Sequence, residues 1–233
     1  MTTRIEKAEL VLFTGGRDST LAACSRMLQN IPVQLLTMNS GCSLHREVLS
    51  FRVKELRERF GSLVLGHQVE DISGSFRSIA LINIESDMKK YQKNLILLGE
   101  KLAIHVHAVA VCKKTGLAVV NDGLTRYQIE FAEQRETART FFYDWMAEFG
   151  IEYRSPIYDY ATTEERVKIR LAQLGLSTKS LEGATMFADS FSTPSDEVVH
   201  EYLVTKRRIA QDILSFLLSG NLEDTEQRGW DET

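Results

Sequence analysis

The chain has 233 residues, of which 43% are hydrophobic and 26% are charged, and its formal net charge is −4. These values are ordinary for a globular protein with a full hydrophobic core, and they exclude a chain that is basic throughout, as many nucleic-acid-binding proteins are. No apolar run is long enough to span a bilayer, and the three cysteines form no C-x-x-C pair, which argues against a disulfide framework and a cysteine zinc site. We therefore expect a cytoplasmic protein with no signal peptide and no membrane partner.

Residues 10–28 predict a strand, a glycine turn and a helix. Residues 10–13 are a short apolar run, Thr14, Gly15 and Gly16 break it, and apolar residues then recur at helical spacing up to residue 28. Either Asp18 or Ser19 is placed to cap the helix. Because glycines let backbone N–H groups approach an anion and a helix start adds unpaired N–H donors, this geometry predicts a phosphate-binding loop.

The rest of the chain alternates strands with helices. We expect strands at residues 33–38, 63–69 and 117–121, a helix from about residue 45 to 60, a connection with partial helix at 70–90, and a long apolar helix at 91–113. Further on we expect helices at 130–149, 164–174 and 196–218, an extended stretch at 151–158, and a loop at 177–195. Thr162 or Thr163 is expected to cap the second of these helices and Ser195 the last.

This order predicts an α/β fold, a doubly wound parallel sheet with helices on both faces and a C-terminal helical extension. We expect residues 1–218 to form a single domain and the acidic residues 219–233 to be disordered. The apolar side of the last helix is suited either to the core or to a homodimer contact.

The sequence Thr14-Gly15-Gly16-Arg17-Asp18-Ser19 resembles the S-G-G-x-D-S motif of the PP-loop ATP pyrophosphatases, with Thr14 in place of the first serine. The resemblance implies an adenine nucleotide α-hydrolase-like fold and a loop that holds the pyrophosphate of ATP while the α-phosphate is attacked. An ordinary glycine-rich turn is the alternative.

Within that superfamily the chain is most similar to the 7-cyano-7-deazaguanine synthases, through residues 41–47, through Lys93-Asn94-Leu95 and through Pro156-Ile157 with the helix that follows. It departs from them because it has no cysteine after Cys112, whereas those enzymes bind zinc through four C-terminal cysteines. The resemblance therefore implies ATP and Mg²⁺ as cofactors, no zinc, and a queuosine-like pathway for the small-molecule substrate.

Several residues are candidates for chemistry, each with a structural alternative. Asp18 is a candidate magnesium ligand, Lys93 a phosphate neutraliser or a solvated lysine, and Cys42 a nucleophile or a buried thiol. His105 and His107 would share a face only on a strand, and their surroundings favour a helix. The predicted ATP-binding residues are Phe13, Thr14, Gly15, Gly16, Arg17, Asp18, Ser19, Thr20, Met38 and Asn39; the catalytic residues are Asp18, Ser19 and Lys93; the substrate residues are His45, Asp122 and Glu182.

The leading hypothesis is a ligase of the ATP pyrophosphatase type that adenylates a carboxylate, amide or carbonyl oxygen of a small molecule for attack by a nitrogen or sulfur nucleophile. Formation of a C–N bond is the expected outcome. The alternatives are an RNA-modifying PP-loop transferase, disfavoured by the acidic net charge, and a nucleotide-binding protein without turnover.

Overall fold

A computed structural model describes residues 8–44, 48–181, 184–185, 187 and 193–220. Its main sheet has five strands in the order β4-β2-β1-β5-β6, and every neighbouring pair is parallel. The strands are β1 (Glu9–Leu12), β2 (Val33–Asn39), β4 (Val64–Asp71), β5 (Val119–Asn121) and β6 (Glu152–Arg154). A separate antiparallel pair joins β3 (Ser43–Leu44) to β7 (Ala184–Thr185).

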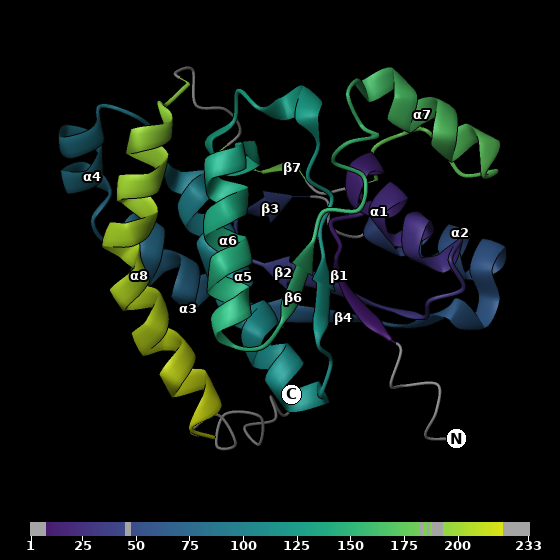
Figure 1. The fold of residues 1–233 in the computed structure, drawn as a ribbon, viewed down its shortest axis with the longest axis horizontal. Helices are drawn as coiled ribbons and strands as arrows, with labels where there is room; N and C mark the ends of the chain where they lie inside the picture. Colours follow the sequence, from purple (N-terminus) through teal and green to yellow (C-terminus); the bar gives the residue numbers. More distant parts are fainter. Residues whose placement is uncertain (1–7, 45–47, 182–183, 186, 188–192, 221–233) are drawn as a thin grey trace, which may run out of the picture.

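Helices cover both faces of the main sheet (Figure 1). One face packs against α1 (Arg17–Met27), α2 (Leu49–Phe60) and α7 (Glu164–Gln173). The core on the other face includes residues of α3 (Ser73–Phe76), α4 (Ile84–Tyr91), α5 (Ile96–Thr115), α6 (Glu136–Glu148) and α8 (Asp196–Leu218), and α8 packs on α5 and α6. The doubly wound α/β fold with a C-terminal helix is therefore confirmed.

Alternation along the central strands explains the two layers. Leu10 and Leu36 belong to the core on the α5 side, whereas Val11 and Leu35 belong to the core on the α1 side, and all four are fully buried. Successive side chains of a strand point to opposite faces, so a strand covered on both sides reads as a continuous apolar run. This is why residues 10–13 carry no polar position.

Several expected boundaries are wrong. The helix expected at 130–149 begins only at Glu136, because short 3-10 turns at Arg126–Gln128 and Ala132–Gln134 precede it and Arg135 is extended. The extended stretch after residue 151 ends at Arg154, and the long apolar helix starts at Ile96 rather than at residue 91, since Tyr91 ends α4. The helix at 196–218 and its Ser195 cap are confirmed, as is the Thr163 cap of α7.

The C-terminal helix lies against α5 at Gly99. A Cβ on Gly99 would lie 2.6 Å from the Tyr202 hydroxyl of α8 and 2.7 Å from Cβ of Ala80, so glycine permits the close approach of these elements. Lys206 of the same helix is buried and ion-pairs with Asp87 of α4 at 2.6 Å. Among the described residues, no helix is both long and apolar enough to cross a membrane.

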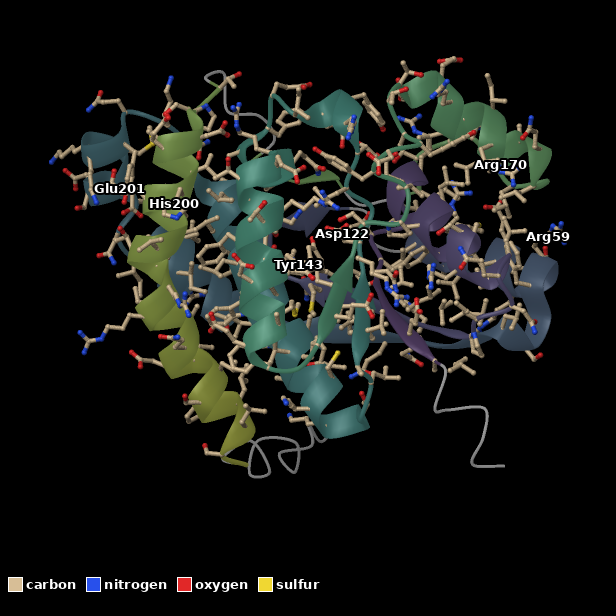
Figure 2. The ribbon with its side chains drawn as sticks, viewed as in Figure 1. Arg59, Asp122, Tyr143, Arg170, His200 and Glu201 are labelled. Carbon is tan, nitrogen blue, oxygen red and sulfur yellow. The ribbon has the colours of Figure 1, made fainter. Side chains whose placement is uncertain are left out.

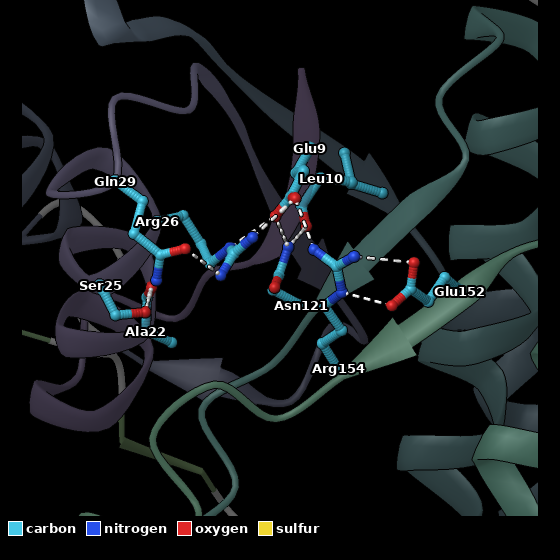
Figure 3. A network of polar contacts seen from close by, with 9 residues as sticks. All are labelled: Glu9, Leu10, Ala22, Ser25, Arg26, Gln29, Asn121, Glu152 and Arg154. Carbon is cyan, nitrogen blue, oxygen red and sulfur yellow. Dashed lines mark hydrogen bonds and ion pairs between the residues drawn. The ribbon is translucent and has the colours of Figure 1, made fainter. Parts of the chain in front are cut away.

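A buried carboxylate joins three strands of the sheet to α1, and Figure 3 shows its partners. Glu9 accepts hydrogen bonds from Arg26 at 2.7 and 2.9 Å, from Asn121 at 2.8 Å and from Arg154 at 2.7 Å. Burial raises the pKa of Glu9, but these hydrogen bonds and the two arginine charges outweigh it and leave the pKa below its usual value. The network ties α1, β1, β5 and β6 together.

Candidate functional site

The glycine turn lies at the carboxyl edge of the sheet, between the ends of β2 and β5. β1 ends at Leu12, and α1 begins at Arg17 with Gly16 as its N-cap residue and no side-chain cap. The expectation that Asp18 or Ser19 caps the helix is therefore wrong, since both lie inside the first turn. Ligands of open α/β sheets bind at this edge, and an uncapped helix start offers N–H donors to an anion.

Hydroxyl groups line the turn. The Ser19 Oγ lies 3.2 Å from the Thr14 nitrogen and 3.1 Å from the Thr14 Oγ1, and the Gly16 N–H donates to the Thr14 Oγ1 at 3.2 Å. Thr20 donates its hydroxyl to the Gly16 carbonyl at 2.6 Å. Thr14 is exposed while Gly15, Gly16, Ser19 and Thr20 are buried, so the turn meets solvent on its Thr14 side.

Gly15 has to be a glycine for two reasons. Its φ is +80°, a backbone conformation that residues with a Cβ rarely adopt, and a Cβ would overlap the Leu181 carbonyl oxygen. Leu181 donates its N–H to the Gly15 carbonyl at 3.3 Å. A segment far along the sequence therefore covers the turn at Gly15.

Asp18 faces Tyr127, which follows β5. The Tyr127 hydroxyl lies 2.9 and 2.7 Å from the two carboxylate oxygens, and burial, with the Asp18 hydrogen bond and charge, raises the pKa of Tyr127. Arg17 ion-pairs with Glu164 of α7. A single carboxylate beside phosphate oxygens suits Mg²⁺, so Asp18 fits the role of a metal ligand that acts together with a bound polyphosphate.

Asp122 lies beside the same helix start. The next residue, Gly123, is so close to α1 that a Cβ would lie 2.6 Å from the Ser19 nitrogen. The Asp122 carboxylate accepts a short hydrogen bond from Tyr153 of β6 and ion-pairs with Lys101 of α5 at 3.5 Å. Its other oxygen accepts the Leu124 N–H at 3.2 Å, which is the contact of a turn-forming aspartate. Figure 2 shows Asp122 near the centre of the molecule.

Charged groups near Asp122 are held away from water. Burial lowers the pKa of Lys101, although Asp122 and Glu133 oppose the shift, and the Lys101 ammonium also donates to the Glu133 carbonyl at 2.9 Å. Burial raises the pKa values of Glu100 and Glu133 above their usual range. Clusters of displaced pKa values are typical of sites that move protons or stabilise charge, and structural ion-pair networks produce them too.

Other predicted site residues occupy different places. Met38 and Asn39 end β2 and are half-buried; Asn39 accepts the Gly41 N–H at 3.0 Å through its side chain. Lys93 lies between α4 and α5 and is half-buried, on the same edge of the sheet because α5 leads into the parallel strand β5. His45 and Glu182 lie outside the described residues, as does the tail from residue 221.

The histidine pair lies on a helix, as its surroundings indicate. His105 stacks on Phe142 with ring centroids 3.9 Å apart, and burial lowers its pKa to about 3. His107 bonds to the Ser75 hydroxyl at 2.8 Å, and no group of three or more metal-ligating side chains occurs in the described part of the chain. Burial and the Glu100 charge raise the pKa of Cys42, which disfavours a thiolate nucleophile.

Sequence reasoning missed Lys101, Tyr127 and Tyr153. The sequence does carry one signal for Lys101: Glu100 and Lys101 are adjacent charges inside an otherwise apolar helical run, where charges are expensive unless they are paired. Nothing local marks the two tyrosines, because their partners are 109 and 31 positions away.

Comparison with solved structures shows which known fold this chain has. A 4-thiouridine synthetase, solved in complex with RNA and with bound ATP, matches with a TM-score of 0.61 and 14% sequence identity, over 92% of this chain and 53% of that one. This chain has an adenine nucleotide α-hydrolase-like fold. It spans about half the length of that neighbour.

Two further structures are similar at lower TM-scores. A predicted subunit of a tRNA methyltransferase from Methanocaldococcus jannaschii matches with 0.45 and 17% identity over 80% of this chain and 98% of that one. The tRNA thiolase NcsA from Methanococcus maripaludis matches with 0.48 and 13% identity over 91% and 72%. No protein-family profile and no curated protein sequence matches the chain. The segment Thr14–Ser19, whose sequence resembles the PP-loop motif, lies at the carboxyl edge of the sheet, where β1 leads into the first turn of α1.

Proposed function

We propose that this chain is a PP-loop ATP pyrophosphatase that adenylates an acceptor oxygen. The observation that carries the proposal is the uncapped start of α1 behind the Gly15–Gly16 turn, with the hydroxyls of Thr14 and Ser19 beside it. Backbone N–H groups and the helix dipole at such a place stabilise a leaving pyrophosphate.

The proposed step breaks the bond between the α-phosphorus of ATP and the oxygen that bridges it to the β-phosphorus. The acceptor oxygen attacks the α-phosphorus, pyrophosphate leaves on the turn, and AMP stays bonded to the acceptor until a nitrogen or sulfur nucleophile displaces it. Residues 13–20 would hold the phosphates, with Met38 and Asn39 beside the adenine, and Lys93 would neutralise negative charge. Mg²⁺ would supply charge neutralisation on the phosphates next to Asp18.

The acceptor is proposed to lie beside Asp122, Lys101 and Tyr153. This cluster adjoins the first turn of α1 through Gly123, so an acceptor held there is next to the α-phosphate of an ATP seated on the turn. The Lys101 ammonium can stabilise negative charge that develops on the acceptor, and Asp122 with Tyr153 keeps that ammonium in place. His45 and Glu182 remain proposed substrate contacts.

We propose a small-molecule acceptor and residues 1–218 as one catalytic domain. The resemblance to the 7-cyano-7-deazaguanine synthases supports a C–N bond as the product, and the net charge of −4 weighs against a nucleic acid. A second candidate is RNA modification, favoured by the RNA bound in the 4-thiouridine synthetase complex.

The deciding experiment measures the products of ATP. The protein is incubated with ATP, Mg²⁺ and either a panel of carboxylates and amides or bulk tRNA, and pyrophosphate and AMP are quantified. Pyrophosphate release that depends on a small acceptor supports the first candidate, and release that depends on tRNA supports the second. Asp18→Ala and Ser19→Ala should each reduce release by about 100-fold or more. Release of ADP and orthophosphate, or ATP binding without turnover, would contradict the proposal.

A further inference from the structure

Arg52 is a cation whose entire side chain is buried between the glycine turn and a distant segment. It lies on α2 and is 0% exposed. Its guanidinium donates to the Ser177 carbonyl at 2.9 Å and to the Lys179 carbonyl at 2.6 Å, and its Nε reaches the Gly15 carbonyl at 3.5 Å. A guanidinium offers five donors in a fixed plane, so one arginine can join three carbonyl groups from two segments.

Glu55, one turn further along α2, completes this arrangement. One carboxylate oxygen accepts from the Arg52 Nη1 at 2.7 Å, and the other accepts the Ser177 N–H at 3.1 Å. Burying an arginine without a partner is costly, and Glu55 supplies the opposite charge that offsets this cost. We call residues 177–181 the strap; they are held by Arg52, by Glu55 and by Arg17, which donates to the Thr178 carbonyl at 3.5 Å.

The strap and Arg52 meet at one atom, the Gly15 carbonyl oxygen. It accepts the Leu181 N–H at 3.3 Å and faces the Arg52 Nε at 3.5 Å. In a trans peptide the carbonyl and the following N–H point in opposite directions. Holding the Gly15 carbonyl toward Arg52 therefore turns the Gly16 N–H outward, where it meets the Thr14 hydroxyl at 3.2 Å on the exposed side of the turn.

An anion-binding turn works only if its N–H groups face the anion and its carbonyls face away. A glycine peptide can rotate easily, because neither Gly15 nor Gly16 has a Cβ to restrict it. We propose that Arg52 is a positioning residue of the phosphate-binding turn: together with the strap it fixes the Gly15–Gly16 peptide with its carbonyl inward and its N–H toward the polyphosphate.

This inference rests on the proposed function in one respect, that the glycine turn binds a polyphosphate. It can therefore be tested with inorganic pyrophosphate as well as with ATP. The test variant is Arg52→Lys, which keeps the positive charge but cannot reach three carbonyls. The matched control is Arg59→Lys on the same helix, because the Arg59 Nε donates at 3.1 Å to the Leu174 carbonyl, close to the strap but away from the turn. Glu55→Gln is a second test variant that loosens the guanidinium without removing it.

On the full chain, calorimetry gives the Kd for pyrophosphate and steady-state kinetics give KM and kcat with ATP. Thermal melting checks that each variant is folded. For Arg52→Lys we expect the Kd for pyrophosphate and the KM for ATP to rise about tenfold or more, with a smaller change in kcat, and Glu55→Gln to shift both constants in the same direction. Arg59→Lys should leave both constants within about twofold of the parent. Hydrogen exchange at the Gly16 amide should accelerate in Arg52→Lys and, to a smaller extent, in Glu55→Gln, but not in Arg59→Lys.

The outcomes separate the two proposals. If the parent binds pyrophosphate but releases none from ATP, adenylation is wrong while the Arg52 effect on pyrophosphate can still confirm the inference. If Arg52→Lys melts like Arg59→Lys and binds pyrophosphate as the parent does, the inference is wrong. If Arg52→Lys unfolds, Glu55→Gln decides by the same measure; and if the parent binds neither anion, both proposals fail.

Discussion

The Tyr127 hydroxyl lies within hydrogen-bond distance of both carboxylate oxygens of Asp18, at 2.9 and 2.7 Å. Tyr127 belongs to a 3-10 turn after β5, and Asp18 belongs to the first turn of α1, so the contact joins two neighbouring loops of the carboxyl edge. The one hydroxyl proton can be donated to either oxygen, and this contact orients the carboxylate, which is what a metal or water ligand requires.

Tyr127→Phe tests this orientation. The variant keeps the ring and removes the hydroxyl, so we expect pyrophosphate release to fall about tenfold and the Mg²⁺ concentration for half-maximal rate to rise. Asp18→Asn, which keeps a hydrogen-bonding side chain but removes the charge, should lose far more activity. A Tyr127→Phe protein with lower melting temperature but unchanged Mg²⁺ dependence would show that the tyrosine only supports the fold.

Asp122→Asn should change the pH dependence of activity. Burial lowers the pKa of Lys101 and the Asp122 charge opposes that shift, so removing the charge lowers the pKa further. If activity needs the ammonium, it is present below this pKa and lost above it. The alkaline limb of the pH–rate profile should therefore move to lower pH, by about one unit.

Tyr153→Phe is the control for that shift. It removes the hydrogen bond to Asp122 but leaves the carboxylate charge next to Lys101, so the alkaline limb should move less. Equal profiles for Asp122→Asn and the parent would mean that the Lys101 ammonium takes no part in the rate-limiting step.

Glu9→Gln should destabilise the protein by about 3 kcal/mol at neutral pH, because Arg26 would be left buried without its countercharge. The folded-state pKa of Glu9 is below its usual value of 4.5, so its contribution is complete above that pH and is lost as the pH falls through the folded-state value. Denaturant unfolding of parent and variant should thus converge at acidic pH. Glu152→Gln, which removes only a partly exposed pair with Arg154, should cost about 0.5 kcal/mol.

His105→Phe should flatten the acid side of the stability curve. The usual histidine pKa is 6.5 and burial lowers that of His105 to about 3, so the unfolded chain takes up a proton that the folded one does not. Stability is complete above pH 6.5 and falls as the pH drops toward 3, with a limiting slope of about 1.4 kcal/mol per pH unit for each such proton. Phenylalanine keeps the stack on Phe142, so the slope of stability against pH should decrease by the contribution of one proton. His107, with a pKa of about 4, still contributes to the slope that remains.

The sequence predicts local structure well where apolar pattern and turn residues agree. Residues 10–27 show a continuous apolar run, two glycines and a helical repeat, and the strand, turn and helix follow in that order. The sequence predicts too early a start for α6, because residues 130–135 carry helix-compatible side chains, whereas contacts such as that of Lys101 with the Glu133 carbonyl arrange the chain there.

The candidate site was predictable only in part. The glycine turn is contiguous, so its residues could be named, but Arg52 lies 37 positions from Gly15 and 127 from Lys179. No spacing rule connects such residues. Lys101, Asp122 and Tyr153 likewise meet only because β5 and β6 are neighbours in the folded sheet and α5 packs close to their ends.

The close approach of Tyr202 to Gly99 has a practical consequence for the two residues that follow Gly99. Glu100 and Lys101 follow Gly99 in α5, and α5 packs against α8 at Gly99. Removing the chain beyond residue 195 would therefore remove the helix that supports this part of α5 and the Lys101 side chain. A truncated protein should then lose activity although every residue proposed to hold ATP is still present, and biochemical work should keep α8 intact.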